Sequence, residues 1–250
     1  MNAAKQRQIE VEGWPGDTSL DAYRRANPLS RVSVYEYFFE ANKHRIKVQN
    51  PSLAIPKLQL IIESIFRISS KRGFHAMSLR DLCQESGLSM GGVYNYISSK
   101  EDVSKMITEF VGVTFVDINQ ALLPPLENTE QRLEALIRAH IYMSELYRSW
   151  YFFVYMETKN QPAEQIKTAI QLEQKMLGEL QAVIDDGISA GIYRTSQSTL
   201  TAAAILSMIQ DWYLKSWHFK GNSVDATSYA DFVVDAARRL LGRLSQVIED

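Results

Sequence analysis

Residues 78–102 read SLRDLCQESGLSMGGVYNYISSKED, a stretch that predicts two short helices, a tight turn and the start of a third helix. The pattern Ser-x-x-Asp occurs twice in it, beginning at Ser78 and at Ser99. In this pattern the hydroxyl and carboxylate groups satisfy backbone N–H groups at the start of a helix. Gly87, between the two starts, supplies the left-handed residue that ends the first helix. This order of elements is that of a helix-turn-helix, which indicates a DNA-reading unit.

The second helix of this unit, expected at about 89–95, is short and contains two adjacent glycines. Each glycine lowers helix stability by about 1 kcal/mol relative to alanine. That cost is understandable where the backbone must lie close to a flat surface, such as a DNA groove or a phosphate ridge. On this helix Val93 and Ile97 are expected to face inward. The residues expected to face outward are Met90, Gly91, Tyr94 and Asn95.

The stretch from residue 61 to residue 102 resembles the TetR family of bacterial transcription regulators. The segments that carry the resemblance are IIESIFRISSKRGF (61–74), MSLRDLCQESGLS (77–89), GGVYNYI (91–97) and SSKED (98–102). The resemblance implies an N-terminal helix-turn-helix DNA-binding domain followed by a helical domain for ligand binding and dimerisation. The alternative is a plain structural three-helix core, in which Met90 and Tyr94 would be packing residues.

In the family, residues at these positions touch DNA in two ways. Those here at Met90, Gly91, Gly92 and Tyr94 lie in the major groove, those at Ser78, Arg80, Tyr96 and Lys100 touch phosphates, and Ser89 and Asn95 complete the expected DNA-binding set. The chain departs from the family pattern at three positions. Met90 stands where a basic or polar residue is frequent, which leaves the base preference open. Ile97 replaces a usual phenylalanine and Cys83 a usual alanine, both apolar changes at positions expected in the core.

The composition is that of a globular protein with a substantial core. Of 250 residues, 46% are hydrophobic and 22% are charged, which is enough for one or two domains. No apolar run approaches the roughly 18 residues of a membrane span. The first residues, MNAAKQRQIEVEGW, lack the apolar centre of a secretory signal, so we expect a cytoplasmic protein without membrane contact. The single cysteine excludes an internal disulfide, and its expected place on an inner helix face predicts a packing role.

The net charge of -2 hides an uneven distribution along the chain. Up to Phe115 there are 15 lysines and arginines against 12 aspartates and glutamates, and after it there are 12 against 17. The positive excess falls on the half that holds the predicted DNA-reading unit. We therefore expect modest nonspecific affinity for DNA and a salt-sensitive specific complex.

Downstream of residue 98 the sequence has a helical pattern almost to its end. Helices are expected at about 99–122, 130–147, 150–157, 163–189, 198–218 and 225–247. The last of them should carry one apolar stripe, formed by Tyr229, Phe232, Val233, Ala236, Leu240, Leu244 and Val247. Because no strand pattern competes, the expected fold class is all-α. We expect three parts: an N-terminal extension (1–55), the helix-turn-helix domain (56–104) and the helical ligand-binding and dimerisation domain (105–250).

The second half also resembles the C-terminal domain of TetR regulators, whose last two long helices form a four-helix bundle with a second subunit. The segment TLTAAAILSMIQ (199–210) fits that role because its small alanines allow close helix approach. The alternative is that these alanines face the core of one subunit. A homodimer is expected in either case, since two recognition helices about 34 Å apart read a palindromic operator in double-stranded DNA.

The segment IYMSELYRSWYFFVYM (141–156) holds more aromatic residues and methionines than one helix face needs for packing. TetR regulators enclose a small effector among their middle helices. The candidate ligand-binding residues are Tyr142, Met143, Trp150, Phe153, Tyr155, Met156, Trp212 and Trp217, each with core packing as its alternative. The segment DWYLKSWHFKG (211–221) is similar to the Trp-rich helix end of some TetR-type regulators of acyl-CoA metabolism. That similarity suggests a small apolar effector of the acyl type.

Residues 1–55 exceed what the resemblance covers. The stretch GWPGDTSLDAYRRANPLS (13–30) looks loop-like, and a helix is expected at about 32–47. One interpretation is an extra helix on the DNA-binding domain, with Arg24, Arg25 or Arg31 reaching a groove. The other interpretation is a docked stabilising helix or a tail.

No catalytic, metal or cofactor site is expected. His140 and His218 have no acidic or cysteine partners at ligand spacing, and no phosphate-binding glycine loop or catalytic triad pattern occurs. Two functions from different classes are considered. One is a ligand-responsive homodimeric repressor, and the other is an architectural or cell-division DNA-binding factor that shares the fold but senses no small molecule. An enzyme, with paired acid and base groups in a cavity, is the third.

Overall fold

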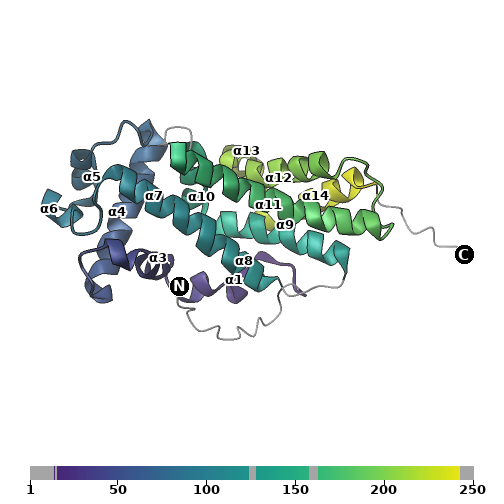
Figure 1. Ribbon diagram of the computed structural model, residues 1–250, viewed down its shortest axis with the longest axis horizontal. Coiled ribbons are helices and arrows are strands. Elements are labelled where there is room, and N and C mark those ends of the chain that lie inside the picture. The colour runs from purple at the N-terminus through teal and green to yellow at the C-terminus, as the bar shows by residue number, and fades with distance from the viewer. Residues whose placement is uncertain (1–13, 15, 124–127, 158–162, 243–250) are drawn as a thin grey trace, which may run out of the picture. The chain divides into compact units, whose positions relative to one another are not determined.

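The computed structural model describes residues 14, 16–123, 128–157 and 163–242. Throughout these residues the secondary structure is helical, with no strand, which confirms the all-α prediction (Figure 1). The chain divides into two compact units. The head unit comprises Val32–Val116 and Tyr147–Gln174, and the bundle unit comprises Met1–Arg31, Asp117–Leu146 and Lys175–Asp250.

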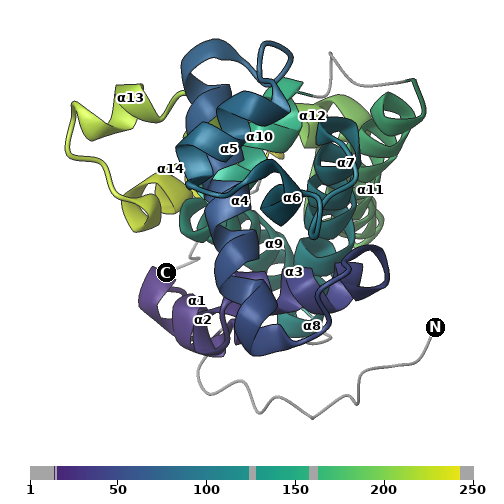
Figure 2. The ribbon, with the colours of Figure 1, turned by 90° about the vertical axis from the view of Figure 1, so that its left-hand side faces the viewer.

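The head unit is built around α4 (Pro51–Arg72), against which α3 (Val34–Asn42) and α5 (Leu79–Ser86) pack (Figure 2). Asn50 begins α4, because its side chain accepts a hydrogen bond from the Ser52 N–H. Apolar residues at helical spacing form the buried side of α4: Ala54, Leu58, Ile61, Ile62, Ile65 and Ile68. The other elements are η1 (Lys43–Arg45), α6 (Met90–Val93), α7 (Lys100–Phe110), a π-helix η2 (Val111–Phe115), α10 (Arg148–Glu157) and the first part of α11 (Ala163–Ser189).

The bundle unit has α9 (Thr129–Leu146) at its centre. Every residue from 135 to 144 is buried, so neighbouring elements must enclose this helix on all sides. Two of them, α12 (Ser198–Leu214) and α14 (Ala226–Leu240), pack on α9 and on each other. The unit also contains α1 (Leu20–Ala26), α2 (Pro28–Arg31), α8 (Val116–Leu122) from Asp117 onward, the second part of α11 and α13 (Ser216–Lys220).

The prediction of a loop at 13–30 is wrong, because α1 and α2 lie there. Ser19 caps α1, with its hydroxyl oxygen accepting a hydrogen bond from the Ala22 N–H at 3.1 Å. A seven-residue helix is too short to be stable alone. Its stability comes from burial of Ala22, Tyr23 and Ala26 in the bundle unit, a tertiary contribution that local sequence does not reveal.

The helix expected at 198–218 is interrupted. It ends at Leu214, and α13 begins after Lys215, whose φ of -120° and ψ of 42° are not helical. The alanines of this helix also divide between two sides. Ala202 is fully buried, whereas Ala204 is exposed.

The single stripe expected on the last helix is wrong for part of its length. Tyr229 and Val233 are buried, but Phe232 is 63% exposed and Leu240 is 49% exposed. The cause is that α14 buries the side carrying Ala230, Val234 and Ala237, which turns a second apolar row outward. Leu244 and Val247 lie outside the described residues.

The helix expected at 99–122 is helical throughout, but its middle is the π-helix η2. Gly112 in this segment lies against Leu172 of α11. A Cβ atom added to Gly112 would be 2.1 Å from Leu172 Cδ1, so this position cannot carry a side chain without rearrangement. Single π-turns inside longer helices are frequent at functional sites.

Candidate nucleic-acid interface

The helix-turn-helix is held by the side-chain caps that its sequence predicts. The Ser78 N–H donates to Asp81 Oδ2 at 2.8 Å, and the Asp81 N–H donates to Ser78 Oγ at 3.2 Å. Gly87 has a φ of +69°, the left-handed conformation that ends α5. Ser89 Oγ accepts from the Gly92 N–H at 3.1 Å and starts α6. These local bonds fix the angle at which α6 leaves the turn.

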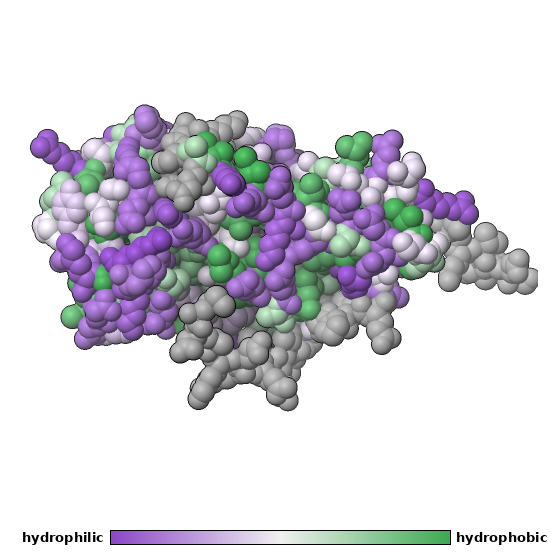
Figure 3. Space-filling model, viewed as in Figure 1, coloured by the Kyte–Doolittle hydropathy of each residue, from purple (hydrophilic) through white to green (hydrophobic). Residues whose placement is uncertain are grey.

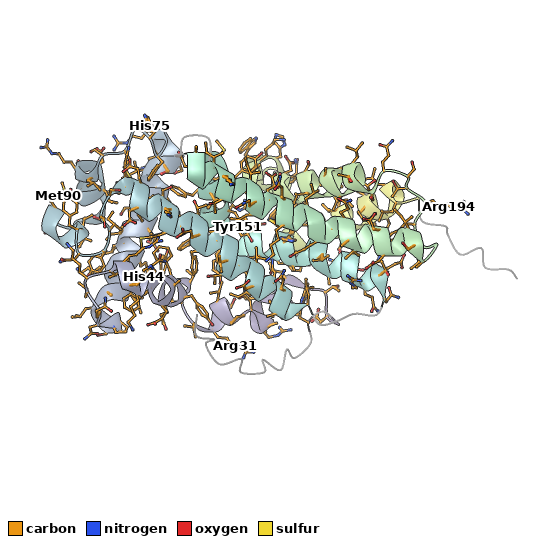
Figure 4. The ribbon with its side chains drawn as sticks, in the orientation of Figure 1. Arg31, His44, His75, Met90, Tyr151 and Arg194 are labelled. Carbon is orange, nitrogen blue, oxygen red and sulfur yellow. The ribbon has the colours of Figure 1, made fainter. Side chains whose placement is uncertain are left out.

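α6 presents one side to the protein and the other to solvent. Val93 and Ile97 are buried in the head unit, as expected. Tyr94 is 41% exposed, and Asn95 is also exposed. Met90 lies at the outer end of α6 (Figure 4), half-buried, with its sulfur 3.9 Å from Cys83 Sγ. The outward side of α6 is therefore a small surface without long charged side chains.

Gly91 has no explanation within the protein itself. A Cβ atom added there would have no atom within 4 Å, and the backbone is helical without a positive φ. Gly92 is different, because an added Cβ would lie 3.2 Å from Ser89 Oγ, the capping atom. Glycine at position 91 thus costs helix stability without relieving any contact in this chain. The open space at position 91 is consistent with the prediction that DNA lies against this side of α6.

The residues expected at phosphates have different surroundings. Ser78 and Arg80 are exposed, whereas Tyr96 is only 7% exposed. The Lys100 ammonium donates to the carbonyl oxygens of His75 at 2.8 Å and Met77 at 3.1 Å. In this structure Lys100 therefore holds the loop between α4 and α5. DNA contact by all ten candidate residues stays a prediction.

An ion pair stabilises the negative charge of Asp81 in the cap of α5. Arg72 Nη2 lies 2.8 Å from Asp81 Oδ1. That hydrogen bond, and then the N–H and hydroxyl of Ser78, hold the pKa of the Asp81 carboxyl well below its usual range. Asp81 thus remains ionised in its cap at neutral pH. Hydrophilic residues cover much of the head unit on the side shown in Figure 3.

Two supports of the interface were missed by sequence reasoning. The Lys47 N–H, just after α3 and η1, donates to the Asn95 carbonyl at 3.0 Å and so ties the extension to the end of α6. Glu157 Oε1, at the end of α10, accepts from the Phe74 N–H at 3.1 Å. For the first support the sequence offers one signal, the apolar Phe38 and Phe39, which anchor α3 in the core of the head unit. For the second support no local pattern marks the pairing.

Four of the eight candidate ligand residues belong to the head unit. The Trp150 ring centroid lies 5.2 Å from that of Phe66 and 5.3 Å from that of Phe110, so Trp150 is a packing residue of this unit. Phe153 is also buried, whereas Tyr155 is 43% and Met156 is 49% exposed.

The other four candidates belong to the bundle unit. The Tyr142 hydroxyl donates to the Thr18 carbonyl at 2.8 Å, and Met143 Sδ accepts from Asn27 Nδ2 at 3.5 Å. Trp212 is buried, with Nε1 donating to Glu145 Oε2 at 2.9 Å, whereas Trp217 is 63% exposed. The structure thus brings Tyr142 and Met143 together beneath the N-terminal segment. Ligand binding by the eight residues stays a prediction.

A charged network crosses the bundle unit. Arg138, whose side chain is 7% exposed, lies 2.8 Å from a Glu134 oxygen and 2.7 Å from an Asp231 oxygen. Arg238 reaches the second oxygen of Glu134 at 2.9 Å. The network joins α9 to α14. Buried pairs of this kind add less stability than their number suggests, but an uncompensated member would be costly.

His140 gives the bundle unit a defined pH dependence. Burial lowers the pKa of His140 to about 4. In the unfolded chain the pKa of this histidine is about 6.5. Its contribution to the free energy of unfolding is therefore fully present above pH 6.5 and is lost as the pH is lowered toward 4. We expect wild type to lose roughly 2 kcal/mol of unfolding free energy between pH 7 and pH 5 through this residue. Urea titrations of wild type and His140→Leu at both pH values would measure the difference.

The exposed His218 supplies the matched control. His218→Leu should retain the wild-type loss between pH 7 and pH 5, whereas His140→Leu should show roughly 2 kcal/mol less. An identical loss in the His140→Leu variant and in wild type would show that His140 is not the source.

Within the described ranges no group of three or more His, Cys, Asp or Glu side chains could hold a metal ion, and no helix could span a membrane. A capped helix-turn-helix with an outward α6, on an all-α chain, is the arrangement found in DNA-binding transcription regulators. Residues 61–105 match the family described as bacterial regulatory proteins, tetR family, and residues 126–241 match the tetracyclin repressor-like C-terminal domain. The chain belongs to the TetR family. Its members are DNA-binding regulators and not enzymes, and this chain is one of them.

Individual relatives agree with this assignment. The chain is 22% identical over 186 residues to the HTH-type transcriptional regulator HbdR of Aromatoleum sp. (strain CIB), covering 74% of this chain and 80% of that protein. It is similar in fold to a tetR-family regulatory protein from Rhodococcus RHA1, with a TM-score of 0.68, 19% identity and coverage of 76% and 98%. It is also similar to AibR solved with isovaleryl coenzyme A and operator DNA, with a TM-score of 0.62, 18% identity and coverage of 75% and 100%.

Proposed function

We propose that this regulator is a homodimeric repressor that leaves a palindromic operator when it binds a small apolar effector of the acyl-CoA class. The observation that carries the effector class is the likeness in fold, over three quarters of this chain, to a regulator solved with both an acyl-CoA and its operator. Tyr142 and Met143, buried on α9 together with Ile137 and Ile141, supply apolar surroundings of the kind such a ligand needs.

The dimer is supported by an apolar surface that a single chain leaves open. Leu200 on α12 is 64% exposed, and Phe232 and Leu240 on α14 are 63% and 49% exposed. Ala204 and Ala236 continue the two rows at a spacing of four residues. α12 and α14 pack on each other, and we take the two exposed rows together as one surface, hereafter the α12/α14 surface. A second copy of the same surface is its expected partner.

A route from effector to DNA is supported by the continuous helix from Lys100 to Leu122. Its beginning, α7, follows the recognition helix in the head unit. Its end, α8, carries Asn119, whose side-chain oxygen accepts from the Tyr23 hydroxyl at 2.5 Å in the bundle unit. A ligand that alters the surroundings of α8 would act on the same helix that leads from α6.

The test uses the purified full-length protein in two measurements. Native mass spectrometry reports subunit number and any retained molecule, and fluorescence anisotropy reports binding to an operator selected from random duplexes. We expect a dimer whose operator affinity falls about 10-fold or more with an acyl-CoA of suitable chain length. Coenzyme A without an acyl group is the control. Equal operator affinity with every acyl-CoA would contradict the effector and favour the architectural factor.

A further inference from the structure

A hollow of about 400 Å³ opens on the bundle unit beside α1 and α2. It is lined by Arg24, Arg25, Ser30 and Arg31. Figure 4 labels Arg31, which lies at the lower edge of the ribbon below α1. All four residues lie outside the two ranges that match the TetR family. The hollow is therefore a feature of the N-terminal extension and not of the matched domains.

The fold of the extension turns these basic side chains outward. α1 buries its apolar side, which leaves Arg24 and Arg25 on the solvent side. Arg31 Nε donates to the Arg25 carbonyl at 3.2 Å, which holds the Arg31 guanidinium beside the end of α1. No partner among the described residues occupies the two terminal nitrogen atoms of Arg31. Its remaining donors thus point to a ligand or to solvent.

The nearby carboxylates neutralise this hollow only weakly. Arg24 pairs with Asp21 at 3.2 Å and Arg25 pairs with Asp17 at 3.6 Å. The two aspartate side chains are 74% and 51% exposed, and exposed pairs of this kind contribute little. Guanidinium groups match phosphate oxygens with two parallel hydrogen bonds, so a phosphate carrying two charges can compete with both aspartates.

The inner side of the same helix is aromatic. Tyr23, next to Arg24, has its ring centroid 5.1 Å from that of Trp14 and 5.7 Å from that of Tyr142. A seven-residue helix thus separates an apolar interior from a basic hollow. Coenzyme A thioesters need both kinds of surroundings, because they join an apolar acyl group to a nucleotide with phosphates at two positions.

We propose that the hollow binds the nucleotide phosphates of a coenzyme A thioester, an inference that rests on the acyl-CoA effector of the proposed function. Arg25 and Arg31 hold the phosphates, and Arg24 adds a third positive charge. The N-terminal extension is then part of the effector site, and it selects coenzyme A esters over free fatty acids.

The experiment is isothermal titration calorimetry on the full-length protein with the double variant Arg25→Gln, Arg31→Gln. The probes are coenzyme A, a series of saturated acyl-CoA esters, and the matching acyl-N-acetylcysteamine thioesters, which lack phosphates. We expect the double variant to bind coenzyme A and its esters about 10-fold more weakly and to bind the phosphate-free thioesters as wild type does. Arg132→Gln, on a half-buried arginine of α9 paired with Asp186 at 2.8 Å, is the matched control and should change neither affinity.

The possible outcomes separate the two proposals. Equal affinity of wild type and double variant for the coenzyme A esters would overturn the inference and leave the proposed function standing. Binding of coenzyme A that depends on the two arginines, without release of the operator, would support the hollow and contradict the proposed function. Failure of wild type to bind any phosphate-bearing probe would overturn both. A loss of operator affinity in the effector-free double variant, with unchanged coenzyme A affinity, would assign the arginines to DNA and overturn the inference.

Discussion

Phe232→Glu combined with Leu240→Glu is expected to convert the proposed dimer into monomers and to reduce operator affinity by roughly 1000-fold or more. The two side chains are 63% and 49% exposed on the α12/α14 surface, so glutamate there would not disturb the core of one chain. In a dimer the same change would bring four carboxylates into an apolar contact, where unpaired charge is costly. A monomer can present only one recognition helix to a palindrome and loses the second half-site.

Sedimentation velocity and operator titration would measure the two effects on one sample. Ile170→Glu is the matched control, because Ile170 is an apolar residue of α11 that is 47% exposed. It should leave both subunit number and operator affinity unchanged. Circular dichroism should show the same helix content for the double variant as for wild type. A double variant that remains a dimer would place the interface elsewhere on the chain.

Gly91→Gln is expected to stabilise the free protein slightly and to abolish tight operator binding. Glutamine is the better helix former by somewhat less than about 1 kcal/mol, and the space around position 91 is open. In the expected complex DNA lies close to the backbone at position 91, so the glutamine side chain would clash with the DNA. Losing about 2 kcal/mol in each half-site corresponds to roughly 1000-fold for a dimer.

A second helical glycine makes this experiment specific. Gly178 of α11 also has no atom within 4 Å of an added Cβ. Gly178→Gln should raise stability in urea titrations to a similar extent and leave operator affinity unchanged. If Gly91→Gln bound the operator as tightly as wild type, the outward side of α6 would not be the surface that meets DNA.

The parts of the interface that sequence predicts are those fixed by neighbours in the chain. Three of these features depend only on residues within four positions, so the sequence pattern alone predicts them: the Ser78 cap, the left-handed Gly87 and the Ser89 cap. The same holds for α11, which spans the expected 163–189 because its apolar periodicity is long. Local rules therefore predicted the shape of the reading unit.

Contacts between distant residues were not predictable in this way. Glu157 caps the Phe74 N–H across 83 positions, and no local pattern marks that pairing. The sequence of α1 looks loop-like when read alone. The helix forms because Tyr23 is buried against residues more than 90 positions away, a contact that local patterns do not show. The composition of residues 141–156 shows that many aromatic side chains are present, but it does not show which unit each of them packs in. Trp150 and Trp212, for example, belong to different units.

The π-turn at Val111–Phe115 sets the angular register of the helix that follows α6. In an α-helix, residues five apart point about 140° away from each other. Phe110 and Phe115 nevertheless have ring centroids 5.5 Å apart, and both contact Trp150, because the i to i+5 bonding of a π-turn stacks them on one side. The π-turn therefore contains one residue more than an α-helical turn would. Deleting Thr114 would place the two phenylalanines four positions apart, where an ordinary α-helix sets side chains only about 40° from each other, so both rings would still face Trp150 without the π-turn.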